Sequence, residues 1–384
     1  MKCRETKHMK KIAFSLALMF LAAGCSRQPK PGPTTSPAAV AAPVSGPFSS
    51  QELQEFAALN PIDTHTHVFA SDPAFYAMLK KLNLHILDIT LVDKSDPETT
   101  NLTTETKNAW DVVHGNNGYA AYCSTFDPFK FGQPHFAQES IRKINADFAK
   151  GAVAVKIWKN VGMKLKDAKG NYVMPDNPAF QPIFKDIAAH NKTLIAHLAD
   201  PDTIWAAPNP AAFDYGYYTK HPELYMYGKP GVPTKQEILQ ARDVILKRNP
   251  KLRVVGAHLG SMEADFHQLG QHLDQYPNFA VDLAARMDYV ATQPHADIIA
   301  FITKYQDRLI YGTDNGFDRS RDEQKALSSW EDRYAKDWRF LATNDMVDYK
   351  GHKVQGLSLP QPILRKIFHD NAVKWFPGIL GASH

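Results

Sequence analysis

Cysteine is scarce in this sequence: its 384 residues include three, Cys3, Cys25 and Cys123. We expect Cys3 to be removed by processing and Cys25 to be modified, which leaves Cys123 as the only thiol of the mature chain. A single thiol forms no intramolecular disulfide, so the small, disulfide-stabilised class of exported domains is excluded. The chain must instead be stabilised by a large hydrophobic core.

The N-terminal segment lacks an apolar run long enough to cross a membrane. Residues 12–23 are apolar, whereas a membrane-spanning helix needs about 20 such residues. Lys10 and Lys11 precede the run and Gly24-Cys25 closes it. This arrangement is similar to a bacterial lipoprotein signal, in which a basic start, a short apolar region and small residues lead to the cleavage site.

This resemblance predicts three segments. Residues 1–24 form the signal peptide, and residues 25–47 form a lipidated Cys25 with a flexible tether rich in Pro and Ala. Residues 48–384 form the remaining segment, a single folded domain. We therefore expect a protein exported and lipid-anchored to the cell envelope of a bacterium, on the periplasmic side or at the outer membrane.

The mature chain also lacks a charge excess. The whole sequence has a net charge of +4, and residues 1–24 alone carry five basic residues and one acidic residue, also +4. The remaining chain is therefore formally neutral, which gives no support for nucleic-acid binding. We expect a small-molecule substrate instead. The sequence leaves open whether the protein forms a homo-oligomer.

The sequence has no internal repeat and no second linker. It also lacks a Gly-x-Gly-x-x-Gly motif after the first strand, which disfavours a doubly wound open sheet. Eight apolar, strand-like runs instead alternate with helical stretches, as in a closed parallel sheet. They are residues 61–69, 84–92, 119–126, 151–158, 193–198, 252–259, 278–284 and 307–314. This pattern predicts an α/β fold, a (β/α)8 TIM barrel in one domain.

Two connections are longer than ordinary turns. Residues 199–235 are rich in Pro, Tyr and His, and residues 315–359 contain Trp330, Tyr334 and Trp338. Both follow a strand and would stand over the C-terminal mouth of the barrel, where chemistry occurs in this fold. They form a lid and pocket wall in one interpretation and ordinary surface insertions in the other.

The first strand carries two histidines, His65 and His67, which must project from the same face because side chains alternate along a strand. Alone, such a pair is as compatible with surface polar residues as with half of a metal site. Lys156, His197 and His258 lie near the ends of strands four to six, and Asp314 ends strand eight. A barrel would bring these ends together, and buried polar groups are costly unless paired or metal-bound.

At these residues the chain resembles the amidohydrolase superfamily, in particular the branch that contains aminocarboxymuconate-semialdehyde decarboxylase and many metal-dependent hydrolases. The residues that carry the resemblance follow a specific order along residues 61–376. They are Asp63-Thr-His65-Thr-His67, His197, His258-Leu-Gly260, Tyr311-Gly-Thr-Asp314 and Asp370-Asn371-Ala372.

The resemblance implies that His65, His67, His197 and Asp314 hold a divalent metal ion. Three imidazoles and one carboxylate indicate Zn²⁺, with a position left for water. Metal-bound hydroxide would attack an amide, ester or lactone carbonyl. Asp314 would act as general base, and His258 would orient the substrate or shuttle a proton.

The role of Lys156 has two interpretations. In binuclear relatives a carboxylated lysine bridges two metal ions, and the histidines of strands five and six, here His197 and His258, bind the second ion. Alternatively, Lys156 is a plain ammonium that faces a carboxylate or the substrate. The metal count is therefore one or two. Asp63 either holds a histidine tautomer or is a polar residue of the barrel floor.

Three residues are candidates for contact with the substrate. Arg286, just past strand seven, could bind a carboxylate through two hydrogen bonds or lie on the outer surface. Trp158 and Lys159, at the end of strand four, could line the mouth.

Two rival functions use the same residues. A non-oxidative decarboxylase would hold a carboxylated substrate at the same metal ion. A non-catalytic lipoprotein would bind a ligand or capture metal without turnover.

Overall fold

The computed structural model describes residues 42–93, 101–318 and 322–381. The predicted signal peptide and the predicted lipidation site Cys25 lie outside these residues. Within the described ranges, no helix combines the length and the apolar character needed to cross a bilayer.

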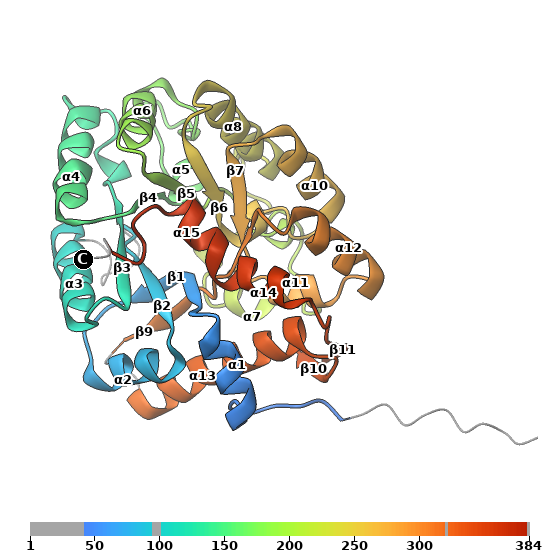
Figure 1. The fold of residues 1–384 in the computed structure, drawn as a ribbon. Helices are drawn as coiled ribbons and strands as arrows, with labels where there is room; N and C mark the ends of the chain where they lie inside the picture. Colours follow the sequence, from blue (N-terminus) through green and yellow to red (C-terminus); the bar gives the residue numbers. More distant parts are fainter. Residues whose placement is uncertain (1–41, 94–100, 319–321, 382–384) are drawn as a thin grey trace, which may run out of the picture. The chain divides into compact units, whose positions relative to one another are not determined.

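The eight predicted strands are confirmed, and each pairs in parallel with its neighbour in the chain. Their bounds are β1 (Ile62–Val68), β2 (His85–Ile89), β3 (Ala120–Thr125), β4 (Ala154–Ile157), β5 (Thr193–Ala196), β6 (Arg253–Gly256), β7 (Phe279–Asp282) and β8 (Leu309–Ile310). The fold is therefore the expected α/β architecture, consistent with a (β/α)8 barrel (Figure 1).

A ninth strand, β9 (Asn315–Phe317), was not predicted and explains how the sheet closes. It begins immediately after Asp314 and pairs in parallel with β1, so β8 and β9 are two halves of one interrupted strand. Two backbone hydrogen bonds bridge the interruption: Thr64 N donates to Tyr311 O over 3.1 Å, and Asp314 N donates to His65 O over 2.7 Å. The break therefore falls on the predicted functional residues, and β8 is shorter than the predicted 307–314.

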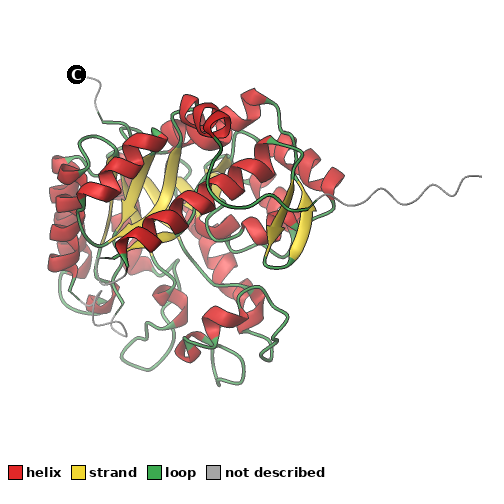
Figure 2. Ribbon diagram, turned by 90° about the horizontal axis from the view of Figure 1, so that it is seen from below, coloured by secondary structure: helices red, strands yellow, loops and turns green. Residues whose placement is uncertain are grey.

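Helices surround the sheet, and many loops gather at one end of the strands (Figure 2). The helices are α1 (Ser50–Ala58), α2 (Pro73–Leu82), α3 (Leu102–Gly115), α4 (Phe136–Lys150), α5 (Asn160–Met163), α6 (Gln181–Ala189), α7 (Tyr215–Tyr218), α8 (Lys235–Arg248), α9 (Ala257–Gly260), α10 (Phe266–Gln275), α11 (Met287–Ala291), α12 (His295–Tyr305), α13 (Glu323–Ala342), α14 (Gln361–Arg365) and α15 (Asn371–Trp375). A segment of π-helix, η5 (Lys366–Asp370), joins α14 to α15.

The barrel interior is apolar towards one end and polar towards the other. Small and branched residues of all eight strands, including Ile62, Ala154 and Val255, pack with Trp375 and Phe376 at the C-terminus of the chain. The α15 region therefore covers one end of the barrel (Figure 1). The histidine-bearing ends of the strands are left at the opposite end.

The two long connections take different positions. The 199–235 connection includes α7 and reaches the mouth of the barrel, since the Lys159 ammonium lies 5.7 Å from the centre of the Tyr217 ring. The 315–359 connection includes β9, α13 and a hairpin of β10 (Met346–Tyr349) and β11 (His352–Gln355). Helix α13 lies against α1 and α14, with Trp330 and Trp338 buried, and so contributes mainly to the outer layer of the barrel.

Residues just before α1 are attached to the domain through α13. The Arg339 guanidinium, 2% exposed, donates to both carboxylate oxygens of Glu52 and to the carbonyl oxygens of Gly46 and Pro47. The backbone N–H of Val44 donates to the Met346 carbonyl of β10. The chain is therefore held from residue 44 onwards.

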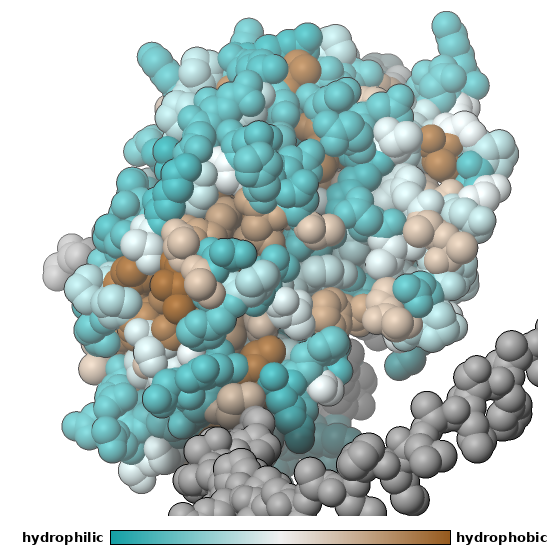
Figure 3. All heavy atoms as spheres, turned by 90° about the vertical axis from the view of Figure 1, so that its right-hand side faces the viewer, coloured by the Kyte–Doolittle hydropathy of each residue, from teal (hydrophilic) through white to brown (hydrophobic). Residues whose placement is uncertain are grey.

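The face drawn in Figure 3 is mostly hydrophilic, and its apolar side chains form separate small areas. Among the described residues, the exposed large hydrophobic side chains are Val44, Tyr217, Tyr227 and Val373. Their low number agrees with a domain whose apolar residues are largely buried.

Asp88 of β2 is a buried carboxyl group, and its effect on stability can be tested. Burial and the nearby Glu105 raise the pKa of Asp88 to about 8, so the folded protein keeps a proton that the unfolded chain loses near pH 4. The stability that this proton provides is complete below about pH 4 and is lost as the pH rises towards 8. We expect Asp88→Asn, which can still accept the Val68 N–H bond, to raise the free energy of unfolding by about 2 kcal/mol at pH 8 and little at pH 4.

Urea denaturation at the two pH values measures this difference. Asp111→Asn, which alters a half-exposed carboxylate of α3, is the matched control and should change stability by less than about 0.5 kcal/mol. Equal stability of Asp88→Asn and wild type at pH 8 would contradict the prediction.

Candidate metal centre

His65 lies at the middle of the candidate site and is fully buried. Its Nδ1 donates to Asp282 Oδ2 at the end of β7 over 2.8 Å. Although burial opposes its ionisation, contact with His65 holds the pKa of Asp282 below its usual range, so this carboxylate is an acceptor. The proton of the imidazole therefore sits on Nδ1, and the Nε2 lone pair is directed towards the site.

His67 is oriented in the same way by a backbone group. Its Nδ1 donates to the Ile89 carbonyl at the end of β2 over 2.8 Å. A carbonyl can only accept, so Nε2 again carries the lone pair. Burial lowers the pKa of His67, which keeps the ring neutral and able to bind a metal ion.

Asp314 completes a group of three with the two histidines. Its Oδ1 lies 3.4 Å from both His65 Nε2 and His67 Nε2. Two ligands of one tetrahedral Zn²⁺ at about 2.0–2.2 Å are about 3.3–3.6 Å apart, so this spacing fits a shared cation. Burial opposes ionisation, but the imidazoles of His258, His65 and His67 hold the pKa of Asp314 well below its usual range.

The backbone around Asp314 is unusual in a way that positions the carboxylate. Asp314 has φ 65°, a left-handed conformation that interrupts β8–β9 and turns the side chain into the mouth. Two residues earlier, a Cβ on Gly312 would approach the His65 Cβ to 3.0 Å. Glycine therefore permits the close approach of this strand to the first histidine.

Lys156 of β4 is buried beside His65, and its Nζ lies 2.9 Å from His65 Nε2. Burial lowers the pKa of this lysine, opposed by the charge of Asp314. The amine therefore faces the same lone pair that a cation would use. Lys156 thus points into the barrel as expected, and its carboxylation stays a prediction.

His258 lies beyond β6 in the short turn α9, not at the strand end. Residues 258–261 all have positive φ, which carries the imidazole back over the barrel, with its centroid 4.7 Å from that of His65. Its Nδ1 donates to the Ala284 carbonyl over 2.9 Å, which leaves Nε2 as an acceptor. Burial, followed by the charge of His197, lowers the pKa of His258 well below its usual value, so the ring is neutral.

His197 follows β5 and has its centroid 4.3 Å from that of His258. Its Nε2 lies 3.1 Å from Asp200 Oδ1. Burial lowers the pKa of His197 to about 3, although Asp200 opposes the shift. The ring therefore lies beside His258, and its Nε2 is engaged by Asp200.

Within the described residues, two groups could hold a metal ion. In each, one ligand atom per residue lies within 4.8 Å of the others; the groups are His65, His67 and Asp314, and His65, His258 and Asp282. Because Asp282 already accepts from the His65 Nδ1 and the His258 backbone N–H, the first group is better suited to a cation.

Two of the three candidates for substrate contact, Lys159 and Arg286, lie beside carboxylates of the protein, and the third, Trp158, lies beside Lys159. Lys159 Nζ donates to Asp200 Oδ2 over 2.7 Å. Arg286 Nε lies 3.8 Å from Glu263 Oε2, and Glu263 also pairs with Lys235. Arg286 is 6% exposed, which excludes the interpretation of an outer-surface arginine.

Asp63 does not contact the His65 ring, whose acceptor is Asp282. Asp63 Oδ1 instead accepts the backbone N–H groups of His65 and Thr313, and Asp63 Oδ2 accepts the hydroxyls of Thr313 and Tyr334. Asp63 therefore joins β1 to the β8–β9 break next to both His65 and Asp314. Burial raises its pKa to about 6.

Three carboxylates of the site were not predicted: Asp282, Asp200 and Glu263. Asp282 closes an apolar strand, and Asp200 follows His197 by three residues; these positions are the signals that the sequence offered. Glu263 has no comparable signal, because it lies beyond the turn α9 and its partners come from α8 and from the loop after β7.

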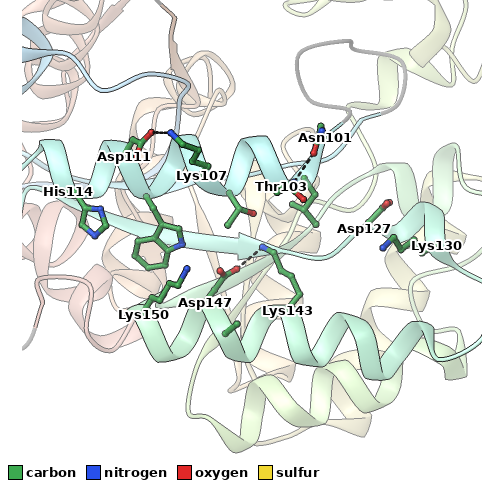
Figure 4. Close-up of a pocket in the computed structure, with 14 residues that line it drawn as sticks. Asn101, Thr103, Lys107, Asp111, His114, Asp127, Lys130, Lys143, Asp147 and Lys150 are labelled. Atoms are coloured by element: carbon green, nitrogen blue, oxygen red, sulfur yellow. Dashed lines mark hydrogen bonds and ion pairs between the residues drawn. The ribbon is translucent and has the colours of Figure 1, made fainter.

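A cavity of about 1100 Å³ lies elsewhere, between α3 and α4 (Figure 4). Four lysines and three aspartates line it, but Lys107 pairs with Asp111 and Lys143 with Asp147. None of the site histidines contributes to its wall. The histidine cluster, not this cavity, is therefore the candidate functional site.

The sequence matches the family model for amidohydrolases, Amidohydro_2, over residues 62–378. This range covers all strands of the barrel and the whole histidine cluster. The chain belongs to this family, and it is an enzyme of the amidohydrolase superfamily. No curated protein sequence matches the chain significantly.

Several solved structures are similar at low identity. A 5-carboxyvanillate decarboxylase from Novosphingobium aromaticivorans, complexed with manganese, is 15% identical, with 82% of this chain and 95% of that chain covered and a TM-score of 0.48. A dihydroxybenzoic acid decarboxylase from Polaromonas sp., with bound manganese, is 11% identical, with 82% and 96% covered and a TM-score of 0.47. A dihydroorotase from Campylobacter jejuni is 11% identical, with 82% of both chains covered and a TM-score of 0.43. Values this low assign neither a reaction nor a substrate to this chain.

Replacement of Asp282 tests the orientation of His65. In Asp282→Asn the side chain can offer an N–H instead of an oxygen to His65 Nδ1, which removes the fixed tautomer. We expect the affinity for Zn²⁺ to fall about 10–100-fold. Competition titration with a chelator measures the Zn²⁺ affinity. The control is Asp274→Asn, at an exposed ion pair on α10. Wild-type affinity in Asp282→Asn would count against the site.

Proposed function

We propose that this protein is a metal-dependent hydrolase that cleaves an amide, ester or lactone bond of a small molecule. One observation carries the proposal: Asp314 Oδ1 lies 3.4 Å from both His65 Nε2 and His67 Nε2, the spacing of two ligands on one tetrahedral cation, and the three ligand atoms lie within 4.8 Å of one another. His197 is the fourth candidate ligand, and its ring packs against the ring of His258.

We infer Zn²⁺ from the donor set, because neutral imidazoles with one carboxylate suit this ion. When bound, the cation would polarise a carbonyl group and lower the pKa of a water molecule. The protein supplies three histidines whose Nδ1 atoms each donate to a fixed acceptor, and a buried environment that strengthens electrostatic interactions.

Two residues are suited to proton transfer. Asp314 is ionised, and its side chain is 33% exposed at the mouth, so it can accept a proton from an incoming water. His258 is neutral, with Nε2 free to accept a proton, and lies against both His65 and His197. Together they can take a proton from water and return it to a leaving group.

The charges at the mouth favour hydrolysis over the alternative, decarboxylation of a carboxylated substrate. In a decarboxylase that holds the substrate carboxylate at the metal ion, a cationic side chain at the mouth would strengthen that binding. Lys159 and Arg286 both face carboxylates of the protein, Asp200 and Glu263. A neutral or weakly polar carbonyl substrate fits this arrangement better than an acid does.

We also propose that the enzyme is exported and anchored through Cys25. The support is the N-terminal pattern of basic residues, a short apolar run and Gly24-Cys25. The substrate would then be a small molecule met in the cell envelope.

Removal of the metal ion and of its ligands tests the proposed reaction. We expect metal-free protein and a His65→Ala, His67→Ala variant to lose turnover at least about 100-fold, and Zn²⁺ to restore the wild type only. A panel of esters, lactones, amides and aromatic acids supplies the substrate. Incorporation of ¹⁸O from labelled water identifies hydrolysis, whereas release of CO₂ without use of water would identify decarboxylation. Full turnover and full metal content in the double variant would rule out both hydrolysis and decarboxylation at this site.

His258→Gln separates a proton shuttle from a second metal ligand. We expect kcat to fall about 100–10,000-fold while elemental analysis still finds the wild-type number of metal ions per chain. Loss of one metal ion per chain would instead indicate the binuclear arrangement with Lys156.

A further inference from the structure

Asp200 lies between two donors in the interior of the site. Its Oδ1 lies 3.1 Å from His197 Nε2, and its Oδ2 lies 2.7 Å from Lys159 Nζ. The three residues are 1%, 6% and 4% exposed, for Asp200, His197 and Lys159 in that order. No part of this chain of contacts is required by the proton transfers assigned to Asp314 and His258.

We propose that Asp200, held by Lys159, is a positioning residue that sets the proton of His197 on Nε2 and directs the Nδ1 lone pair of this ring to the centre of the site. A carboxylate beside an ammonium stays ionised and can only accept, so it must receive its second bond from the histidine. This inference rests on the proposed metal-dependent function, because the lone pair matters only if the ring binds a cation.

The arrangement differs from that of the other three histidines. His65, His67 and His258 each hold their proton on Nδ1, against Asp282, the Ile89 carbonyl and the Ala284 carbonyl. His197 is held through the opposite nitrogen. The His197 ring would therefore offer Nδ1 to a cation, whereas the other three rings would offer Nε2.

The turn that carries Asp200 is built for this contact. Ala199 has φ 67°, a left-handed conformation that folds the chain back so that a carboxylate three residues after His197 reaches its ring. The Ala199 carbonyl accepts a hydrogen bond from Ser261 Oγ over 3.1 Å. This bond joins the turn after His197 to the turn after His258.

Lys159 is in turn held by the walls of the mouth. Its Nζ lies 5.4 Å from the centre of the Trp158 ring and 5.7 Å from that of Tyr217 in the 199–235 connection. Both contacts are within the range of a cation–π interaction. Lys159 therefore acts on the site through Asp200, which differs from the substrate-binding role expected from the sequence.

The Asp200→Asn substitution is expected to change which nitrogen of His197 carries the proton. The ammonium of Lys159 attracts the amide oxygen, so the amide N–H₂ turns towards His197 and the ring must accept through Nε2. The tautomer of His197 is then inverted, and its proton moves to Nδ1. In Asp200→Asn, Lys159→Met the amide is free to turn its oxygen back to His197, so the double variant should recover part of the loss.

The experiment uses the full-length protein labelled with ¹⁵N-histidine. Nitrogen–proton correlation spectra of the metal-free protein, with His197→Gln to assign the ring, report the tautomer directly. Titration with Zn²⁺ against a chelator reports affinity. We expect Asp200→Asn to invert the tautomer and to lower Zn²⁺ affinity about 10–100-fold, with partial recovery in the double variant. Asp202→Asn, whose side chain is 62% exposed in the same connection, is the matched control and should equal wild type.

The outcomes separate the possible roles. If Lys159 binds substrate, Lys159→Met raises KM at least about tenfold with unchanged Zn²⁺ affinity, which overturns the inference. An unchanged His197 tautomer in Asp200→Asn also overturns it. If Asp200→Asn does not fold, the wild-type spectrum decides: a proton on Nδ1 of His197 overturns the proposal, and a proton on Nε2 supports it. Because these spectra need no metal ion, they stand even if the wild type binds no Zn²⁺, a result that would reject only the proposed function.

Discussion

The closure of the sheet between its last and first strands is the constraint on which the site depends. β8 pairs with β7 and β9 pairs with β1, and the break between the two halves places Asp314 beside His65. The Asp314 N–H donates to the His65 carbonyl over 2.7 Å, so a ladder hydrogen bond joins two candidate ligands. Asp63 reinforces the junction by accepting hydrogen bonds from His65 and Thr313. Disruption of this closure would separate the ligand group even if each strand stayed intact.

The second organising feature is the control of each imidazole by an acceptor on its far side. A neutral histidine has one donor and one acceptor nitrogen, so an acceptor at one nitrogen decides what the other can bind. Asp282 and two backbone carbonyls play this part for His65, His67 and His258. Burial lowers the pKa of His67 and His258, which keeps these two rings neutral and suits them to a cation. The carboxylates of the site are consequently as important as the histidines.

Much of the fold and part of the site could be read from the sequence. The eight apolar runs predicted the barrel, since fully buried parallel strands are continuous in hydrophobicity. The ninth strand escaped prediction because Asn315–Phe317 has no strand pattern of its own and exists only by pairing with β1. His65, His67 and Asp314 were placed together correctly in space, whereas Asp282, Asp200 and Glu263 were missed. A single aspartate in a loop or at a strand end looks like any other polar residue until its partner is known.

The sequence by itself determined the order of strands and helices, the family, and which residues lie at the strand ends, because these properties follow from local hydrophobic patterns and motifs. Only the tertiary structure decided which nitrogen of each histidine is free, that Lys159 and Arg286 face carboxylates of the protein, and that Asp63 joins strands instead of holding a ring. These features depend on contacts of a few ångströms between residues as many as 271 positions apart, as for Asp63 and Tyr334. Hydrogen bonds have short reach and strict direction, so no pattern along the chain encodes them.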